Sequence, residues 1–166
     1  MAGGVPTLKI EDRGKLTFAR IHSGALAIGH RPPLRSLPRM REAGVTHIAT
    51  VLSEREEPHA IETAVREAGL SWLWVELGST KTLPARAKPE IAAALDLLSS
   101  ILAAGGCVYL HCAAGIHRTG MITAALLFRL GLSEDEARAV LTALREVTAR
   151  EMGQERWTWA SSFARS

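Results

Sequence analysis

The sequence predicts an α/β fold with a mainly parallel central sheet and helices on both faces. Short apolar runs rich in β-branched residues alternate along the chain with longer runs of helical spacing. Prolines open several helical runs and glycines close them, which marks where the elements begin and end. Strands that alternate with helices favour a parallel sheet, and ligands of such sheets bind outside the carboxyl ends of the strands.

The amino-terminal part of the chain contains a tail, two strands and a helix. Residues 1–15 are polar and contain glycine, so we expect a flexible tail there. Two short apolar runs, 16–21 and 25–28, are separated by a Ser-Gly turn and are predicted strands. The spacing of leucine and methionine predicts a helix over 34–41, and Gly44 stands where a helix C-cap is expected.

Strand and helix alternate through the middle of the chain. β-Branched residues predict a strand over 46–52, and a helix is expected from Pro58 to Ala68. A further strand covers 72–77, and its two tryptophans are interpreted as core or sheet-face residues. After a loop, the next helix begins at Pro89 and ends at a pair of glycines.

The last third of the chain reads as a strand followed by helices. An apolar strand is predicted over 107–110 and a helix over 121–130. Ser133 and Glu136 have the spacing of a capping box, and the helix that they begin is expected to extend to about Ala149. Aromatic residues near the carboxyl terminus indicate a final segment that packs back on the core.

Length and composition indicate an ordinary globular protein. The chain has 166 residues, of which 47% are hydrophobic, so residues 16–166 are predicted to form a single domain. The net charge of +3 is too small for a typical nucleic-acid binder, and no apolar run approaches the roughly 20 residues that span a membrane. Two cysteines and the lack of signal-peptide features favour the cytoplasm. We therefore expect no nucleic-acid partner and no membrane partner; the sequence does not indicate an oligomeric state.

The most informative stretch is the loop between the strand at 107–110 and the helix that follows it. Its sequence, over residues 111–120, is His-Cys-Ala-Ala-Gly-Ile-His-Arg-Thr-Gly. A short loop at a helix N-terminus binds anions, because its backbone N–H groups lack partners and the helix dipole adds positive potential. Small residues let these amides converge on one point. The residues predicted to bind phosphate are Ala113, Ala114, Gly115, Ile116, His117 and Arg118.

Two residues of this loop have a direct chemical role in the prediction. Cys112 stands near a helix N-terminus and an arginine, a setting that favours the nucleophilic thiolate. The guanidinium of Arg118 presents a planar fork of donors that matches two oxygens of a phosphoryl group. We expect the Thr119 hydroxyl to stabilise the sulfur as a leaving group. The ring of His111 is expected to hold the loop by hydrogen bonds.

The pattern His-Cys, five residues, then Arg-Thr-Gly resembles the signature of the cysteine-based protein tyrosine and dual-specificity phosphatases. Six specified positions coincide in a strand–loop–helix context, and a weaker likeness extends over roughly residues 16–150. The resemblance implies a fold of this phosphatase family and a phosphocysteine mechanism. In that mechanism Cys112 attacks phosphorus, Arg118 clamps the phosphoryl oxygens, and water releases phosphate. It also implies phosphotyrosine and/or phosphoserine and phosphothreonine in proteins as substrates.

One part of the family's pattern is missing from this sequence. The family normally carries an aspartate on a mobile loop before the cysteine, and this aspartate protonates the leaving oxygen. Here Leu77 occupies the expected place, and none of the three aspartates lies in the following loop. Glu76 is the nearest carboxylate and is the candidate general acid. Two alternatives stay open: Glu54 supplies the proton, or the leaving group needs no acid.

Other functions also stay open at the level of the sequence. One is a degenerate phosphatase that binds phosphate or phosphoproteins, and another is a phosphatase of a small, non-protein phosphate ester. Thiol redox chemistry is disfavoured, because the only other thiol, Cys107, lies on a predicted strand. Lys81, Arg86 and His117 are candidates for a positive rim. Scattered histidines and the lack of a Cys-x-x-Cys pair predict no metal, and we expect no cofactor.

Overall fold

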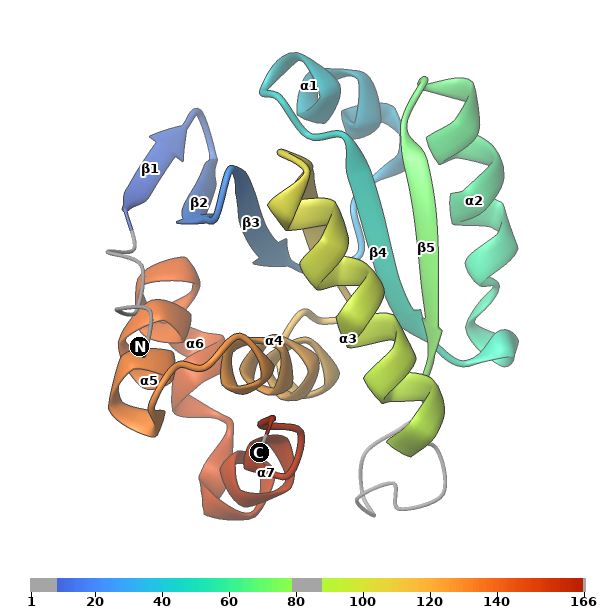
Figure 1. The fold of residues 1–166 in the computed structure, drawn as a ribbon. Coiled ribbons are helices and arrows are strands. Elements are labelled where there is room, and N and C mark those ends of the chain that lie inside the picture. The colour runs from blue at the N-terminus through green and yellow to red at the C-terminus, as the bar shows by residue number, and fades with distance from the viewer. Residues whose placement is uncertain (1–8, 79–87, 166) are drawn as a thin grey trace.

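A computed structural model of the chain describes residues 9–78 and 88–165, and within these ranges one sheet of six strands forms the centre of the fold (Figure 1). The strands are β1 Ile10–Arg13, β2 Leu16–Ile21, β3 Gly24–Gly29, β4 His47–Leu52, β5 Ser71–Glu76 and β6 Cys107–His111. The helices are α1 Leu37–Glu42, α2 Pro58–Glu67, α3 Lys88–Ala103, α4 His117–Arg129, α5 Glu134–Leu144, α6 Glu146–Arg150 and α7 Gly153–Ser161. Two single 3₁₀ turns, η1 Leu34–Ser36 and η2 Glu54–Glu56, precede α1 and α2.

The strand order of the sheet is β1-β2-β3-β6-β4-β5. Strands β3, β6, β4 and β5 are paired in parallel, whereas β1 and β2 extend the sheet in antiparallel pairs. The predicted α/β architecture with a mainly parallel sheet is therefore confirmed. Because the four parallel strands point the same way, their carboxyl ends meet at one edge of the sheet.

Each face of the sheet is covered by its own set of helices. The larger core packs one face against α3, α4, α5 and α7, and the smaller core packs the other face against α1 and α2 (Figure 1). Side chains of β6 alternate between the two cores: Val108 and Leu110 belong to the larger one, Cys107 and Tyr109 to the smaller. The same alternation places the Cys112 side chain with the larger core, on the face that α4 covers.

The structure corrects the predicted tail at four of its residues. Ile10–Arg13 form β1, which pairs with β2 in an antiparallel ladder. The carboxylate of Glu11 accepts hydrogen bonds from Arg13 and from Arg20 of β2, at 3.0 and 3.1 Å. None of the four residues is buried, and for that reason the strand lacks the apolar alternation by which strands are recognised.

Two helix boundaries also differ from those predicted. Helix α4 begins at His117 rather than Met121, so that Arg118 and Thr119 lie in its first turn. The helix expected to extend to Ala149 ends at Leu144, because Arg145 is extended, with φ −164° and ψ 105°. Helix propensity does not reveal this break. At the break, the side chain of Arg145 makes a tertiary contact with the loop after β6.

Candidate active site

The loop after β6 closes beneath the sulfur of Cys112. The Cys112 side chain is 3% exposed, and its Sγ accepts a hydrogen bond from the Gly115 N–H at 3.2 Å. Gly115 has φ +71°, and a Cβ there would lie 2.2 Å from the carbonyl carbon of Gly29 and 2.5 Å from the His30 nitrogen. Only glycine therefore fits this position.

All four carbonyl groups from Cys112 to Gly115 have hydrogen-bond partners, the first in the adjacent residue His111 and the other three in distant parts of the fold. The Ala113 oxygen accepts from the Arg31 N–H at 3.0 Å, and the Cys112 oxygen lies 2.8 Å from His111 Nδ1. Arg145 Nη1 donates to the oxygens of Ala114 and Gly115 at 3.0 and 2.7 Å, and Thr148 Oγ1 donates to Gly115 at 2.6 Å. In a trans peptide the N–H points opposite to the carbonyl. Fixing these carbonyls therefore also fixes the direction of the N–H groups of the same peptides, and the N–H of Gly115 is directed at Cys112 Sγ.

Arg118 is held by a carboxylate from a distant turn. Its Nη1 and Nη2 donate to the two oxygens of Glu56 at 2.6 and 2.8 Å, and Nη1 also donates to the Leu77 carbonyl at 3.0 Å. Three of the five guanidinium donors are thereby used. The other edge, Nε–H and one Nη2–H, is directed at no carboxylate or carbonyl of the described residues. The Glu56 hydrogen bonds, and further the charge of Cys112, raise the pKa of Arg118.

Glu56 is a site residue that sequence reasoning missed. It ends η2, where Ser53 N and Oγ donate to its Oε2 at 2.8 and 2.9 Å. The hydrogen bond from Arg118, supported by those from Ser53, lowers the pKa of Glu56 to about 2, so it is ionised at neutral pH. A signal for it exists in the sequence, because Ser53 and Glu56 have capping-box spacing directly after a predicted strand. What the sequence does not show is that this carboxylate meets Arg118.

The ring of His111 lies inside the sheet and is neutral. It is fully buried, and burial lowers its pKa to about 4. Its Nδ1 faces the Cys112 carbonyl, and its Nε2 lies 2.8 Å from Thr50 Oγ1 in the neighbouring strand. The histidine thus connects the cysteine backbone to β4.

The remaining predicted loop residues lie around the start of α4. Thr119 is fully buried, and its hydroxyl has no hydrogen-bond partner within residues 9–78 and 88–165. Ile116 is half-buried, whereas Ala113, Ala114 and His117 are exposed. The other two residues proposed for a positive rim, Lys81 and Arg86, lie outside the described part of the chain.

The two candidate acids lie at the same edge of the sheet, but neither forms a hydrogen bond or an ion pair with Cys112 or Arg118 among the described residues. Glu76 is the exposed last residue of β5, paired in register with Leu52. It follows Trp72 and Trp74 in strand alternation, so it belongs to the α2 face, opposite to the face of Cys112.

Leu77, which stands in the expected place of the aspartate, is 6% exposed and belongs to the larger core. Glu54 is the exposed first residue of η2, the turn that Glu56 ends.

Comparison with known proteins settles the family. The family model described as "Polymorphic toxin system, DSP-PTPase phosphatase" matches residues 30–132, which is more than half of the chain and includes the whole loop after β6. The chain belongs to this phosphatase family. Among curated proteins, no sequence matches the chain.

Solved phosphatases share the fold of this family member. Kinase associated phosphatase with its catalytic-site cysteine replaced by serine has a TM-score of 0.72 at 13% identity, over 94% of this chain and 93% of that one. PTPMT1 in complex with PI(5)P has a TM-score of 0.70 at 21% identity, over 88% and 93% of the two chains. TpbA of P. aeruginosa in complex with pTyr has a TM-score of 0.57 at 16% identity, over 95% and 86%. At these identities the likeness shows the fold alone.

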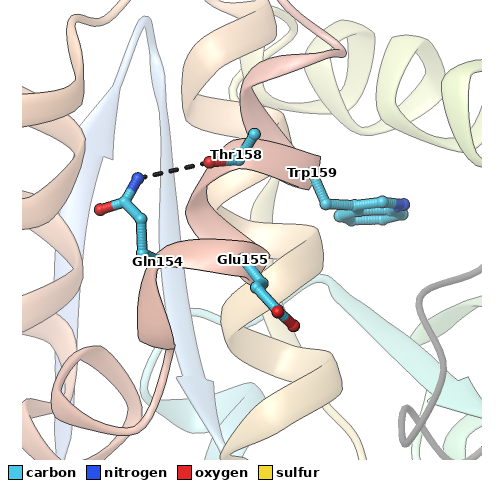
Figure 2. Close-up of a pocket in the computed structure, with 4 residues that line it drawn as sticks. All are labelled: Gln154, Glu155, Thr158 and Trp159. Carbon is cyan, nitrogen blue, oxygen red and sulfur yellow. Dashed lines mark hydrogen bonds between the residues drawn. The ribbon is translucent and has the colours of Figure 1, made fainter.

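A depression elsewhere on the phosphatase domain is separate from this site. It lies on α7 and is lined by Gln154, Glu155, Thr158 and Trp159, with Gln154 Nε2 donating to Thr158 Oγ1 at 3.3 Å (Figure 2). None of these residues belongs to the loop after β6. Among the described residues, no group of three His, Cys, Asp or Glu side chains is arranged to hold a metal ion. None of the described helices is both long and apolar enough to span a bilayer.

Proposed function

We propose that this chain is a cysteine-dependent phosphatase that hydrolyses phosphomonoesters through a phosphocysteine intermediate. The observation that carries the proposal is the arrangement around one sulfur. Cys112 Sγ lies over a loop whose carbonyls are all bound by donors, beside an arginine that keeps one edge for a ligand. A thiolate, converging N–H groups and a guanidinium fork are the groups that a phosphoryl transfer to sulfur requires.

In the proposed reaction, the Cys112 thiolate attacks phosphorus and the bond from phosphorus to the leaving oxygen breaks. The free edge of Arg118 and the loop N–H groups bind the phosphoryl oxygens, whose negative charge they stabilise. A proton passes to the leaving oxygen. Water then attacks the phosphocysteine, inorganic phosphate leaves, and the thiolate is regenerated. The Thr119 hydroxyl, buried in the first turn of α4, is proposed to stabilise the departing sulfur.

The test is hydrolysis of para-nitrophenyl phosphate by wild type and by Cys112→Ser. The serine variant should lose turnover by about 10⁴-fold or more, since an alkoxide is not formed at neutral pH, but it should still bind vanadate. Binding survives because Arg118 and the loop amides are unchanged. Turnover of the serine variant at the wild-type rate would refute the covalent mechanism.

For the leaving-group proton, Glu76 stays our first candidate and Glu54 the second. Glu76→Gln keeps the shape and removes the proton, so it should slow alkyl phosphate hydrolysis by about 10²-fold and affect esters of acidic phenols much less. The position of Glu76 on the α2 face means that its carboxylate reaches the site only around the strand end. If Glu76→Gln hydrolyses alkyl phosphates as fast as wild type, the same comparison at Glu54 follows. Equal rates there as well would indicate an enzyme without a dedicated acid.

As substrates we propose phosphotyrosine and/or phosphoserine and phosphothreonine in proteins, with the cytoplasm as compartment and residues 16–166 as one catalytic domain. The neighbour TpbA binds pTyr, which supports this choice. A small phosphate ester is the second candidate, because PTPMT1 is a neighbour in complex with PI(5)P and another is the core catalytic domain of the PP-IP phosphatase SIW14 from S. cerevisiae. A panel of phosphopeptides and phosphorylated inositols, compared by kcat/KM, separates the two.

A further inference from the structure

A chain of side-chain hydrogen bonds leads from the edge strand β5 to the backbone of Cys112. Trp72 Nε1 donates to Thr50 Oγ1 at 2.9 Å, and Thr50 Oγ1 lies 2.8 Å from His111 Nε2. His111 Nδ1 in turn lies 2.8 Å from the Cys112 carbonyl oxygen. Thr50 and His111 are both fully buried, and strand register places them side by side in β4 and β6. This series of hydrogen bonds therefore crosses three adjacent strands, β5, β4 and β6.

The first and last groups of this hydrogen-bond series determine the direction of every hydrogen bond in it. The indole of Trp72 has a donor only, and the carbonyl of Cys112 is an acceptor only. His111 must therefore carry its proton on Nδ1. In a neutral ring Nε2 is then an acceptor, which requires the Thr50 hydroxyl to donate to it while accepting from the indole. Each polar atom is satisfied in this one arrangement.

The opposite arrangement is unfavourable in a buried site. A proton on Nε2 would direct two donors, the imidazole and the Trp72 indole, at the single Thr50 oxygen. The Thr50 proton would then be left without an acceptor, and the bare Nδ1 would face the Cys112 oxygen lone pairs. Unsatisfied or opposed groups of this kind are destabilising, because the lost hydration of a buried donor or acceptor is then not offset by a hydrogen bond.

We propose that Trp72 and Thr50 are positioning residues that hold His111 in the Nδ1–H tautomer and, through it, hold the Cys112 peptide in the orientation that favours the thiolate. With the Cys112 carbonyl bound to the ring, the Ala113 N–H of the same trans peptide points the opposite way. The inference rests on the proposed function in one respect, namely that the Cys112 thiolate is the reacting group.

The same proposal explains how Trp72, a half-buried residue on an edge strand, influences Cys112, which lies two strands away. Trp74 provides a contrast, because it stacks on Trp72 at 6.1 Å but donates to the Leu52 carbonyl, outside the chain of bonds. Other charged or titratable groups also lie near His111 and Cys112. Those that interact with His111 or Cys112 are His30, Arg31, Arg118 and Tyr109. None of them is changed by substitutions at the tryptophans or at Thr50.

The experiment is the pH dependence of Cys112 alkylation by iodoacetamide, followed by mass spectrometry of the Cys112 peptide so that the buried Cys107 does not interfere. Thr50→Val removes the hydroxyl at constant shape. The pH midpoint of Cys112 alkylation in this variant should rise by about one pH unit, which corresponds to about tenfold less alkylation on the acid side of the midpoint. Trp72→Phe should move it the same way by about half as much, because Thr50 still reaches His111. Thr50→Ser should restore the wild-type midpoint. Trp74→Phe, the matched control, should not shift it.

Several outcomes would overturn the inference. One is an unchanged midpoint in Thr50→Val, and another is an equal shift in Trp74→Phe, which would show a general effect of packing. A purely structural role predicts lower stability with the midpoint unmoved. These results are separate from the proposed function, because alkylation does not need turnover. Conversely, absence of para-nitrophenyl phosphate hydrolysis by wild type would refute the function and leave the alkylation comparison valid.

A measurement on the unmodified protein avoids any folding defect of the variants. Long-range ¹H–¹⁵N NMR spectra of the histidine rings distinguish the two neutral tautomers. We expect His111 to show a protonated Nδ1 and an unprotonated Nε2 between pH 6 and pH 8, consistent with a pKa lowered to about 4 by burial. A proton on Nε2 would overturn the proposal without any mutation.

Discussion

At the scale of single residues, the site is organised around the charges of two side chains. Arg118 is 11% exposed and Glu56 31% exposed, and their ion pair has two parallel hydrogen bonds. The carboxylate fixes one edge of the guanidinium, so that its rotation is restricted and its other edge stays available to the phosphoryl group that we propose as ligand. The pair also stores a pH-dependent contribution to stability, because the folded state holds Glu56 in its ionised form.

The ion pair leads to a prediction for Glu56→Gln. The pKa of Glu56 is lowered from 4.5 to about 2, so its contribution to stability is complete above pH 4.5 and disappears as the pH falls towards 2. The variant should therefore be less stable than wild type by on the order of 2 kcal/mol at pH 7, after allowance for partial exposure, and by little at pH 2.5. Urea unfolding at the two pH values measures this difference. Glu54→Gln, on the same turn, is the control, and a gap that does not narrow in acid would contradict the assignment.

At the scale of elements, the loop after β6 is held from three sides. The end of β3 provides the Arg31 N–H, the turn after β4 provides Glu56, and the break between α5 and α6 provides Arg145 and Thr148. Helix α5 ends before Arg145 because this residue is extended, and the extended conformation directs its guanidinium at two loop carbonyls. Close packing against β3 then requires glycine at position 115.

This packing predicts a large effect for Gly115→Ala. The added methyl would meet backbone atoms of Gly29 and His30, which cannot move without breaking the β3–β6 ladder, and the positive φ adds strain. We expect a loss of about 2–4 kcal/mol in unfolding free energy, together with loss of vanadate binding. Gly131→Ala is the matched control, because Gly131 has φ +95° with nothing within 4 Å of a Cβ. Its cost of about 1 kcal/mol isolates the backbone strain; equal effects at the two glycines would refute the steric argument.

At the scale of the whole molecule, the parallel sheet gathers the site from distant parts of the sequence. The carboxyl ends of β3, β4, β5 and β6 contribute, in order, the Arg31 N–H, Glu56, the Leu77 carbonyl and Cys112. This convergence brings together the Arg118–Glu56 ion pair and the Cys112 thiol, the groups on which the proposed phosphoryl transfer depends. Cys107, the second thiol, faces the other core, where burial raises its pKa.

This arrangement of the site predicts which reagents should inhibit the activity of the protein and which should not. Activity towards para-nitrophenyl phosphate should be unchanged by a chelator such as EDTA and should be abolished by vanadate or by iodoacetamide. Vanadate occupies the phosphate position, and alkylation consumes the Cys112 thiolate. The measurement is the residual rate after each treatment, with phosphate present during alkylation as a protection control. Loss of activity on chelation, restored by a divalent ion, would contradict a purely thiol-based mechanism.

The sequence by itself determined the strand–loop–helix unit around Cys112, most of the element boundaries and the family resemblance, because those signals depend on residues that are close neighbours in the chain. Tertiary structure decided which distant groups reach the loop. Glu56 and Arg118 are 62 positions apart, and Thr50 and His111 are 61 apart. Strand order and parallel register place such pairs together, and neither is encoded in local periodicity. For the same reason the polar strand β1 and the break at Arg145 were not predicted, since pairing and a loop contact stabilise them rather than local propensity.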